Sequence, residues 1–204
     1  MYEYKFSITD TATIIGHSRP GPYSARVGVR KQIEQMMEDG ILELSASSFI
    51  NPLTIGYREN KEPRICIDAR RVNNVMLPDR ARARPIDEML QQFHGVKYMT
   101  SLDLISAFLQ IPLEASSRKY TPFLFDTNVY HFLRLSFGTK NSLAAFVQGL
   151  RKVLGSDVSS FCTCYVDDIV IFSKTFEEHL RHLNLIFKKL TTAGFTINAL
   201  KCKF

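Results

Sequence analysis

The sequence lacks the features that identify disulfide-rich, zinc-stabilised or membrane-spanning proteins. Its four cysteines form no Cys-x-x-Cys pair and have none of the histidine spacing of a zinc module, so we expect reduced, buried or half-buried thiols. No apolar run approaches the ~20 residues that cross a bilayer, and the N-terminus does not have the basic and apolar pattern of a secretory leader. The sequence therefore predicts a soluble, intracellular protein without a membrane partner.

The composition is that of a globular chain with a basic surface. Its 204 residues are 45% hydrophobic and 11% aromatic, which is enough to bury a core in one domain or two small ones. The formal net charge of +6 suits a polyanionic partner, but many ordinary soluble domains have a similar charge. Charge alone therefore does not identify a nucleic-acid-binding protein.

Apolar residues recur at helical spacing in several segments, which predicts helices. These segments are residues 24–40, 85–95, 141–154 and 175–193. The last segment also has the pattern of a capping box formed by Thr175 and Glu178, and Gly194 follows as its stop. This local pattern predicts both ends of that helix.

Shorter apolar segments bounded by turn residues predict strands. They are residues 53–57 with 64–68, 98–104, 120–125 with 129–135, and 161–166 with 169–172. Strands that alternate with helices in this order indicate an α+β fold, in which an antiparallel sheet is backed by helices. Residues 1–22 have no clear period and are predicted to form an N-terminal arm.

Three aspartates stand at the ends of predicted strands. Asp167 and Asp168 are adjacent within the apolar run Tyr165-Val166-Asp167-Asp168, and Asp103 ends an earlier strand. Hard divalent cations prefer oxygen ligands, and a polymerase holds two such ions about 3.5 to 4 Å apart. If the strands pair, the three carboxylates converge. The sequence therefore predicts a two-metal phosphoryl-transfer site of a nucleic-acid polymerase.

An alternative interpretation is that the two adjacent aspartates only form a hairpin turn, because Asp favours turns. The apolar residues on both sides argue against it, since two charges buried between strands require a metal or another partner. An unrelated α+β domain with purely structural acids remains a further alternative at this point.

The chain resembles the fingers and palm of a reverse transcriptase, most closely that of gypsy-type LTR retrotransposons, from about residue 29 to residue 204. The resemblance rests on five ordered segments. They are Arg64-Ile65-Cys66-Ile67-Asp68-Ala69-Arg70-Arg71-Val72-Asn73, Ser101-Leu102-Asp103-Leu104-Ile105-Ser106-Ala107-Phe108-Leu109-Gln110-Ile111-Pro112, Leu135-Ser136-Phe137-Gly138-Thr139-Lys140-Asn141-Ser142, Tyr165-Val166-Asp167-Asp168-Ile169-Val170-Ile171-Phe172-Ser173 and Lys201-Cys202-Lys203-Phe204.

This resemblance implies an RNA-directed DNA polymerase that adds deoxynucleotides to a primer 3′-hydroxyl. The implied catalytic residues are Asp103, Asp167 and Asp168, which would hold two Mg2+ ions, replaceable by Mn2+, with the carbonyl of Leu104 as an extra ligand. The implied partners are an RNA template, a DNA primer, deoxynucleoside triphosphates and the rest of a polyprotein. The expected location is the cytoplasm or virus-like particles, and no oligomeric state is predicted.

The resemblance also implies positions that contact the nucleotide or the template. They are Arg64, Asn73, Phe108, Gln110, Phe137 and Gly138. Arg64 would reach the triphosphate, since a guanidinium suits phosphate oxygens, although it is otherwise an ordinary charged strand residue. Phe108 would lie under the sugar and exclude a 2′-hydroxyl, although an aromatic residue at this spacing is otherwise a core residue.

In this family the palm has a ferredoxin-like sheet and the fingers carry hairpins. The resemblance divides the chain into an arm (1–22), fingers (23–97), palm (98–115), a fingers hairpin with the pocket loop (116–140) and palm (141–204). The family continues beyond this point with a thumb, a connection and an RNase H region. The chain is therefore expected to be a fragment of a polyprotein product.

The chain departs from the family pattern at a few positions. Ala107 stands where the family usually has Gly, and alanine at a position that needs close approach or positive φ crowds or strains the turn. Ser136 and Leu143 replace prolines. These departures suggest as an alternative a degenerate or co-opted, non-catalytic nucleic-acid-binding module.

Two further patterns are weaker signals. His179 and His182 have the i, i+3 spacing of a metal pair but no third ligand, so we expect a solvated first helical turn. Arg80, Arg82 and Arg84 could face phosphates, but a solvated basic loop is the favoured interpretation.

Overall fold

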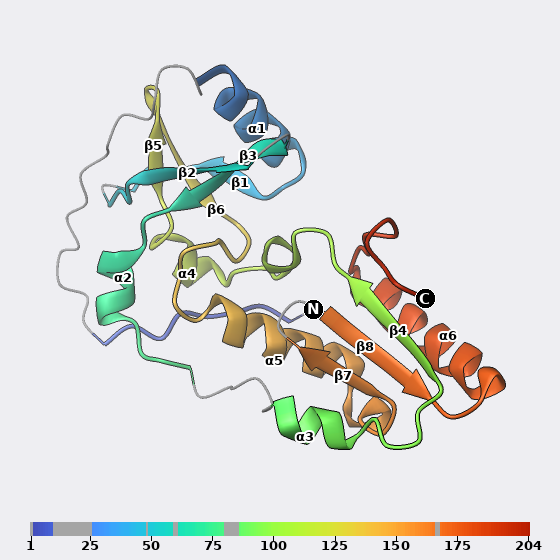
Figure 1. Ribbon diagram of the computed structural model, residues 1–204. Helices are drawn as coiled ribbons and strands as arrows, with labels where there is room; N and C mark the ends of the chain where they lie inside the picture. Colours follow the sequence, from blue (N-terminus) through green and yellow to red (C-terminus); the bar gives the residue numbers. More distant parts are fainter. Residues whose placement is uncertain (1, 10–25, 48, 59–60, 80–85, 166–167) are drawn as a thin grey trace. The chain divides into compact units, whose positions relative to one another are not determined.

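A computed structural model describes residues 2–9, 26–47, 49–58, 61–79, 86–165 and 168–204 (Figure 1). Backbone contacts divide the chain into two compact units. Unit 1 consists of Met1–Tyr2, Asp79–Gln110 and Leu143–Phe204, and unit 2 consists of Glu3–Pro78 and Ile111–Ser142. Each unit is therefore assembled from segments that are distant in the sequence.

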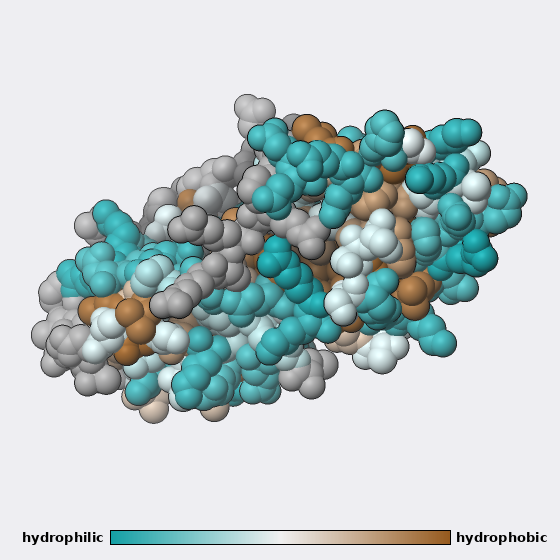
Figure 2. Space-filling model, turned by 90° about the horizontal axis from the view of Figure 1, so that it is seen from below, coloured by the Kyte–Doolittle hydropathy of each residue, from teal (hydrophilic) through white to brown (hydrophobic). Residues whose placement is uncertain are grey.

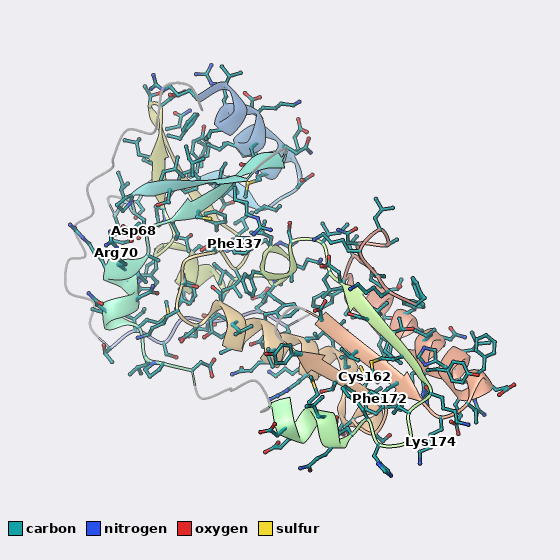
Figure 3. All side chains as sticks on the ribbon, viewed as in Figure 1. Asp68, Arg70, Phe137, Cys162, Phe172 and Lys174 are labelled. Atoms are coloured by element: carbon teal, nitrogen blue, oxygen red, sulfur yellow. The ribbon has the colours of Figure 1, made fainter. Side chains whose placement is uncertain are left out.

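Unit 1 contains a three-stranded antiparallel sheet in the order β4-β8-β7. The strands are β4 (Tyr98–Asp103), β7 (Cys162–Tyr165) and β8 (Asp168–Ser173). Ile169 and Ile171 are fully buried on one face of β8, while Phe172 on the other face meets Phe93 edge-on with ring centroids 5.1 Å apart (Figure 3). The apolar run that predicted this strand is thus explained by burial on both faces.

Helix α6 (Phe176–Ala193) packs against β8 and β4. Its predicted capping box is confirmed, since Thr175 Oγ1 accepts from Glu178 N at 3.3 Å and Glu178 Oε2 accepts from Thr175 N at 3.3 Å. Gly194 ends the helix in the left-handed conformation. Local sequence signals therefore define both ends of this helix.

The expectation of a solvated first turn in this helix is wrong for His179. Its side chain is buried, with 6% exposure, and bonds to Thr100 Oγ1 at 2.8 Å and to Ser173 Oγ at 3.0 Å. His182 also bonds to Ser173 Oγ, at 2.8 Å, and stacks on Phe161. The two histidines tie α6 to the sheet through hydroxyl groups, because a buried imidazole needs hydrogen-bond partners.

The remaining helices among the described residues of unit 1 are α3 (Ile86–Gln91), the 3-10 helices η2 (Ala107–Gln110) and η3 (Ser156–Val158), and α5 (Ser142–Leu154), whose first residue belongs to unit 2. The amphipathic pattern of α5 is confirmed, since Phe146, Val147 and Leu150 are all buried. These residues supply part of the core of unit 1.

Unit 2 contains a three-stranded sheet in the order β1-β6-β5 and a two-stranded hairpin of β2 and β3, all antiparallel. The strands are β1 (Leu42–Leu44), β2 (Leu53–Arg58), β3 (Lys61–Ile67), β5 (Phe123–Phe125) and β6 (Asn128–Phe132), and the helices are α1 (Arg26–Glu38), α2 (Arg70–Val75) and α4 (Ala115–Arg118). Val29 and Ile33 of α1 are buried, as the helical spacing predicted. Tyr4 and Phe6 are buried as well, and Tyr4 N donates to Pro112 O at 2.9 Å.

The α+β fold with antiparallel sheets is confirmed, while the predicted ends of several elements differ. The second predicted hairpin is shorter than expected because Thr121 Oγ1 accepts from the backbone N of Phe132 at 2.9 Å. A side chain thus takes the place of a backbone partner, and strand pairing begins only at Phe123.

The four cysteines are free thiols, as expected, and Cys162 is the buried one (Figure 3). Burial raises the pKa of the Cys162 thiol, so this group stays protonated. None of the helices within the described ranges is long and apolar enough to cross a membrane. In the view of Figure 2 the coloured surface is mostly hydrophilic, with hydrophobic residues in separate areas.

Candidate active site

The structure brings Asp103 and Asp168 together across the two strands β4 and β8. Asp103 is the last residue of β4, Asp168 is the first residue of β8, and the two are direct Cα partners in the antiparallel register. The apolar residues that precede Asp103 and follow Asp168 hold this register, because a slip by one residue would expose the buried face. The sheet core therefore positions the two carboxylates opposite each other.

Backbone hydrogen bonds fix which kind of pair these aspartates form. Ser101 exchanges two bonds of 2.9 Å with Lys203 on the far side of β4, and Asp103 O accepts from Asn198 N at 2.8 Å on that same side. Asp103 and Asp168 are therefore a non-hydrogen-bonded pair, in which Cα atoms are about 4.5 Å apart and both side chains leave from one face. This is the closer of the two antiparallel arrangements.

The third predicted carboxylate, Asp167, lies outside the described residues. Within the described ranges, no group of three or more His, Cys, Asp or Glu side chains is placed to hold a metal ion. Arg80, Arg82 and Arg84 also lie outside the described ranges. Of the three predicted acids, the structure therefore describes the positions of Asp103 and Asp168.

The environment of Asp103 suits a divalent cation. Its Oδ1 atom is buried and has no hydrogen-bond partner among the described residues, while its Oδ2 atom lies 3.5 Å from Lys201 Nζ. An unsatisfied buried acceptor costs about 1–3 kcal/mol, and a like charge directly opposite adds repulsion. A divalent cation bound by both carboxylates would remove both penalties, and carboxylate oxygens are its preferred ligands.

The chain turns sharply after β4 and is held there by Gln110. Leu104, the predicted carbonyl ligand, has a buried side chain and forms an isolated bridge with Ile197. The Gln110 amide donates to Ile105 O at 2.5 Å and to Thr196 O at 3.0 Å, and accepts from Thr196 N at 2.8 Å. The side chain that was predicted to contact template or pocket thus joins the backbone of this turn, at Ile105, to the backbone of the segment after α6, at Thr196.

Phe108 lies in η2, just after the same turn. Its half-buried ring meets the buried ring of Phe146 edge-on, with centroids 5.9 Å apart and an interplanar angle of 77°. Edge-to-face contacts of this kind hold an aromatic ring in one orientation. The ring is therefore fixed from one side while part of it stays accessible.

In unit 2, Arg64 and Phe137 contact each other. The exposed Arg64 side chain of β3 places its guanidinium 5.4 Å from the ring centroid of Phe137, which is labelled in Figure 3. A cation–π contact restricts the long arginine side chain while leaving its N–H donors available. The two residues thus form an ordered, positively charged group.

The loop that follows Phe137 is attached to α2 by Asn73. Asn73 Nδ2 donates to Gly138 O at 2.9 Å, and its Oδ1 accepts from Lys140 N at 2.8 Å. Gly138 has a φ of +103°, and a Cβ at this position would lie 2.4 Å from Ile67 O. Only glycine fits this conformation and this close approach to β3. Asn73 and Gly138 therefore fix the conformation of this loop.

The sequence model of the reverse transcriptase (RNA-dependent DNA polymerase) family matches residues 54–204. The chain belongs to the reverse transcriptase family. The resemblance to gypsy-type LTR retrotransposons is confirmed, because the relatives of this chain include Pol polyproteins of such transposons. Reverse transcriptases generally use divalent metals, in agreement with the carboxylate pair of this chain.

Relatives of this reverse transcriptase chain include two Drosophila melanogaster proteins. The Pol polyprotein of transposon opus is 33% identical over 196 residues, which are 94% of this chain and 20% of the relative. The Pol polyprotein of transposon gypsy is 32% identical over 182 residues, which are 86% of this chain and 18% of the relative. The chain thus spans about a fifth of the length of these curated relatives.

Solved structures of foamy viral protease-reverse transcriptase share the fold. One, in complex with double-stranded DNA, has a TM-score of 0.86 at 24% identity and covers 96% of this chain and 34% of its own. Another, in complex with an RNA/DNA hybrid, has a TM-score of 0.83 at 23% identity and covers 97% of this chain and 27% of its own. This similarity agrees with a palm and fingers architecture.

One residue of the acidic site had no predicted role. Lys201 contacts Asp103 although the two are far apart in the sequence. The signal that marks it is its place in the Lys201-Cys202-Lys203-Phe204 segment of the family pattern. Spacing alone did not reveal the contact, because it depends on pairing between β4 and the end of the chain.

Proposed function

We propose that this reverse transcriptase chain is the polymerase part of an RNA-directed DNA polymerase, which adds deoxynucleotides to a primer 3′-hydroxyl. The observation that carries the proposal is the direct pairing of Asp103 with Asp168 at the edge of the sheet in unit 1. Such a pair of opposed carboxylates is a poor structural feature without a cation. It is a suitable ligand set for the metal ions of phosphoryl transfer.

Two Mg2+ ions are the proposed cofactors, and Mn2+ can replace them. Asp103 and Asp168 would hold them, together with Asp167 and the Leu104 carbonyl. The ions supply charge neutralisation at the phosphates and lower the pKa of the attacking hydroxyl. The protein's own contribution is to hold both carboxylates on rigid strands, which positions the ligands before the substrate arrives.

Unit 2 would supply the groups that bind the incoming nucleotide. Arg64 is held against Phe137 with its donors exposed, and this supports a role in binding the triphosphate. Asn73 fixes the Gly138 loop, which supports a role for both in shaping the nucleotide pocket. In unit 1, the Phe146 contact orients Phe108, which supports its assignment as the ring that excludes a ribose 2′-hydroxyl.

An RNA template and a DNA primer are the proposed nucleic-acid partners. The foamy viral structures contain double-stranded DNA or an RNA/DNA hybrid, which supports this assignment by similarity of fold. We propose that unit 1 corresponds to most of the palm and unit 2 to most of the fingers. The bounds differ from those that the resemblance implies, since residues 79–97 of the expected fingers belong to unit 1 and residues 111–115 of the expected palm belong to unit 2. We expect the thumb and RNase H regions of a polyprotein to complete the enzyme. Its proposed location is the cytoplasm or virus-like particles.

The test is primer extension on an RNA template with a chain extended to include the downstream regions. Asp103→Asn and Asp168→Asn should each lower the rate of deoxynucleotide incorporation by about 100-fold or more, because each removes a charged metal ligand and so weakens binding of the ions that stabilise the transition state. Asp157→Asn is the matched control, since Asp157 is an exposed acid of unit 1 that pairs with Lys189. Equal incorporation by Asp103→Asn and the control would refute the proposal.

A further inference from the structure

We propose that Lys201 acts as the counter-cation of Asp103 when no metal ion is bound. Its ammonium group stabilises the metal-free acidic site and competes with the incoming divalent ion. The inference rests on the proposed function, because it assumes that Asp103 is a metal ligand. It adds a residue that sets the metal affinity of the site.

The backbone places Lys201 beside Asp103 with little freedom. Ile105 N donates to Thr196 O at 3.1 Å and Asn198 N donates to Asp103 O at 2.8 Å before the turn, and Lys203 pairs with Ser101 after it. The turn itself is closed by Lys201 N, which donates to Asn198 O at 3.0 Å. The turn that carries Lys201 is therefore attached to β4 at both ends.

The contact joins the more exposed oxygen of the Asp103 carboxylate to the ammonium group of a largely exposed lysine side chain. Lys201 Nζ lies 3.5 Å from Asp103 Oδ2, and the side chains are 58% and 25% exposed. Among the ion pairs of the described residues, this is the one that involves Asp103 or Asp168. Lys201 thus supplies the positive charge that the two opposed carboxylates need when no metal is bound.

An ammonium group cannot satisfy this site as a metal does. It leaves Asp103 Oδ1 buried without a partner, and it lies where a cation bound to Oδ2 would be repelled. The lysine stem is long and flexible, so the ammonium can swing into solvent when a divalent ion binds. The contact therefore stabilises the metal-free site and weakens metal binding at the same time.

The test is a calorimetric titration of the whole 204-residue chain with Mn2+ alone, together with thermal melting with and without Mn2+. Lys201→Met should bind Mn2+ about three- to tenfold more tightly than wild type, since a partly exposed charge at this distance has a moderate effect. It should also show a larger upward shift of the melting temperature on addition of Mn2+. Lys203→Met is the matched control, because it removes the same charge from the same segment and keeps the backbone pairing with Ser101. Its affinity should stay within about twofold of wild type.

Asp103→Asn separates the two proposals. If this variant binds Mn2+ as wild type does, the acidic pair is not the metal site and the proposed function fails. If it loses Mn2+ binding while Lys201→Met and Lys203→Met bind equally, the counter-cation role alone is overturned. Lys201→Gln, which keeps a polar group without the charge, decides the matter if the methionine variant does not fold.

Discussion

Replacing Gly138 by alanine should destabilise unit 2 by about 2–5 kcal/mol. The backbone at Gly138 has a φ of +103°, and a residue with a Cβ loses roughly 1–2 kcal/mol in the left-handed region. The new methyl group would also lie 2.4 Å from Ile67 O, which is a backbone atom of β3 and cannot rotate away. Forced displacement in a packed region costs about 1–3 kcal/mol more.

Two other glycines of unit 2 separate these contributions. Gly40 has a φ of +64° and nothing within 4 Å of an added Cβ, so Gly40→Ala measures backbone strain alone. Gly56 has no positive φ, and an added Cβ would meet Arg64 atoms at 3.7 and 3.8 Å, which are ordinary contacts, so Gly56→Ala should be near neutral. Urea unfolding followed by circular dichroism gives the free energy of unfolding of each variant. If Gly138→Ala costs no more than Gly40→Ala, the close approach to β3 has no energetic weight and the reasoning is wrong.

Further predictions concern three polar side chains. Gln110→Ala should lower the free energy of unfolding by about 1–3 kcal/mol, because two backbone carbonyls lose their donor. Gln110→Glu should lower it further, because a carboxylate would face those two carbonyl oxygens. Urea unfolding in which the Glu variant is more stable than the Ala variant would contradict this. Burial lowers the pKa of His179, so the unfolded chain takes up a proton first and the melting temperature should fall as the pH drops below about 6.5. A slope between pH 5 and 8 that is unchanged in His179→Gln would refute that assignment. Asp126→Asn removes ion pairs to two arginines of α1. It should lower the free energy of unfolding by less than about 1 kcal/mol at low salt and leave it unchanged at about 1 M salt. If the urea midpoints of wild type and variant differ as much at high salt as at low salt, the cause is not electrostatic.

Elements with local signals were predictable from the sequence. Helix α6 has its capping box and its terminal glycine within its own segment, and the apolar residues of β4 and β8 predicted both strands. The pairing of Asp103 with Asp168 followed from placing acids at the ends of two strands of one sheet. These features depend on neighbouring residues or on a single pairing of strands.

Elements held by distant contacts were missed. Strand β1 has three residues and is defined by its pairing with β6, and α4 has four residues and no side-chain cap. So short a helix is unstable by itself, since helix nucleation is costly. Likewise, two of the three bonds of Gln110 depend on Thr196, which is 86 residues away.

The burial of His179 could have been found from the sequence. It precedes Ile186 by seven residues and Leu190 by eleven, which places all three on one helical face, and all three are buried. The expectation of a solvated turn gave more weight to the neighbouring glutamates than to this period. The error shows that a polar residue in phase with a buried stripe should be assigned to the core and given hydrogen-bond partners.

The turn after Asp103 reverses another expectation, that alanine at position 107 strains the chain. Among the described non-glycine residues, positive φ occurs at Ser106, with 45°, and at Asp126, whereas Ala107 has no positive φ and is 7% exposed. Ser106→Gly should therefore raise the free energy of unfolding by up to about 1 kcal/mol, because it relieves the left-handed position. Ala107→Gly should lower it by about 1–2 kcal/mol, because a buried methyl group and backbone restriction are both lost. Urea unfolding of the two variants checks this pair of opposite signs, and a stabilising Ala107→Gly would restore the case for a chain whose turn has degenerated.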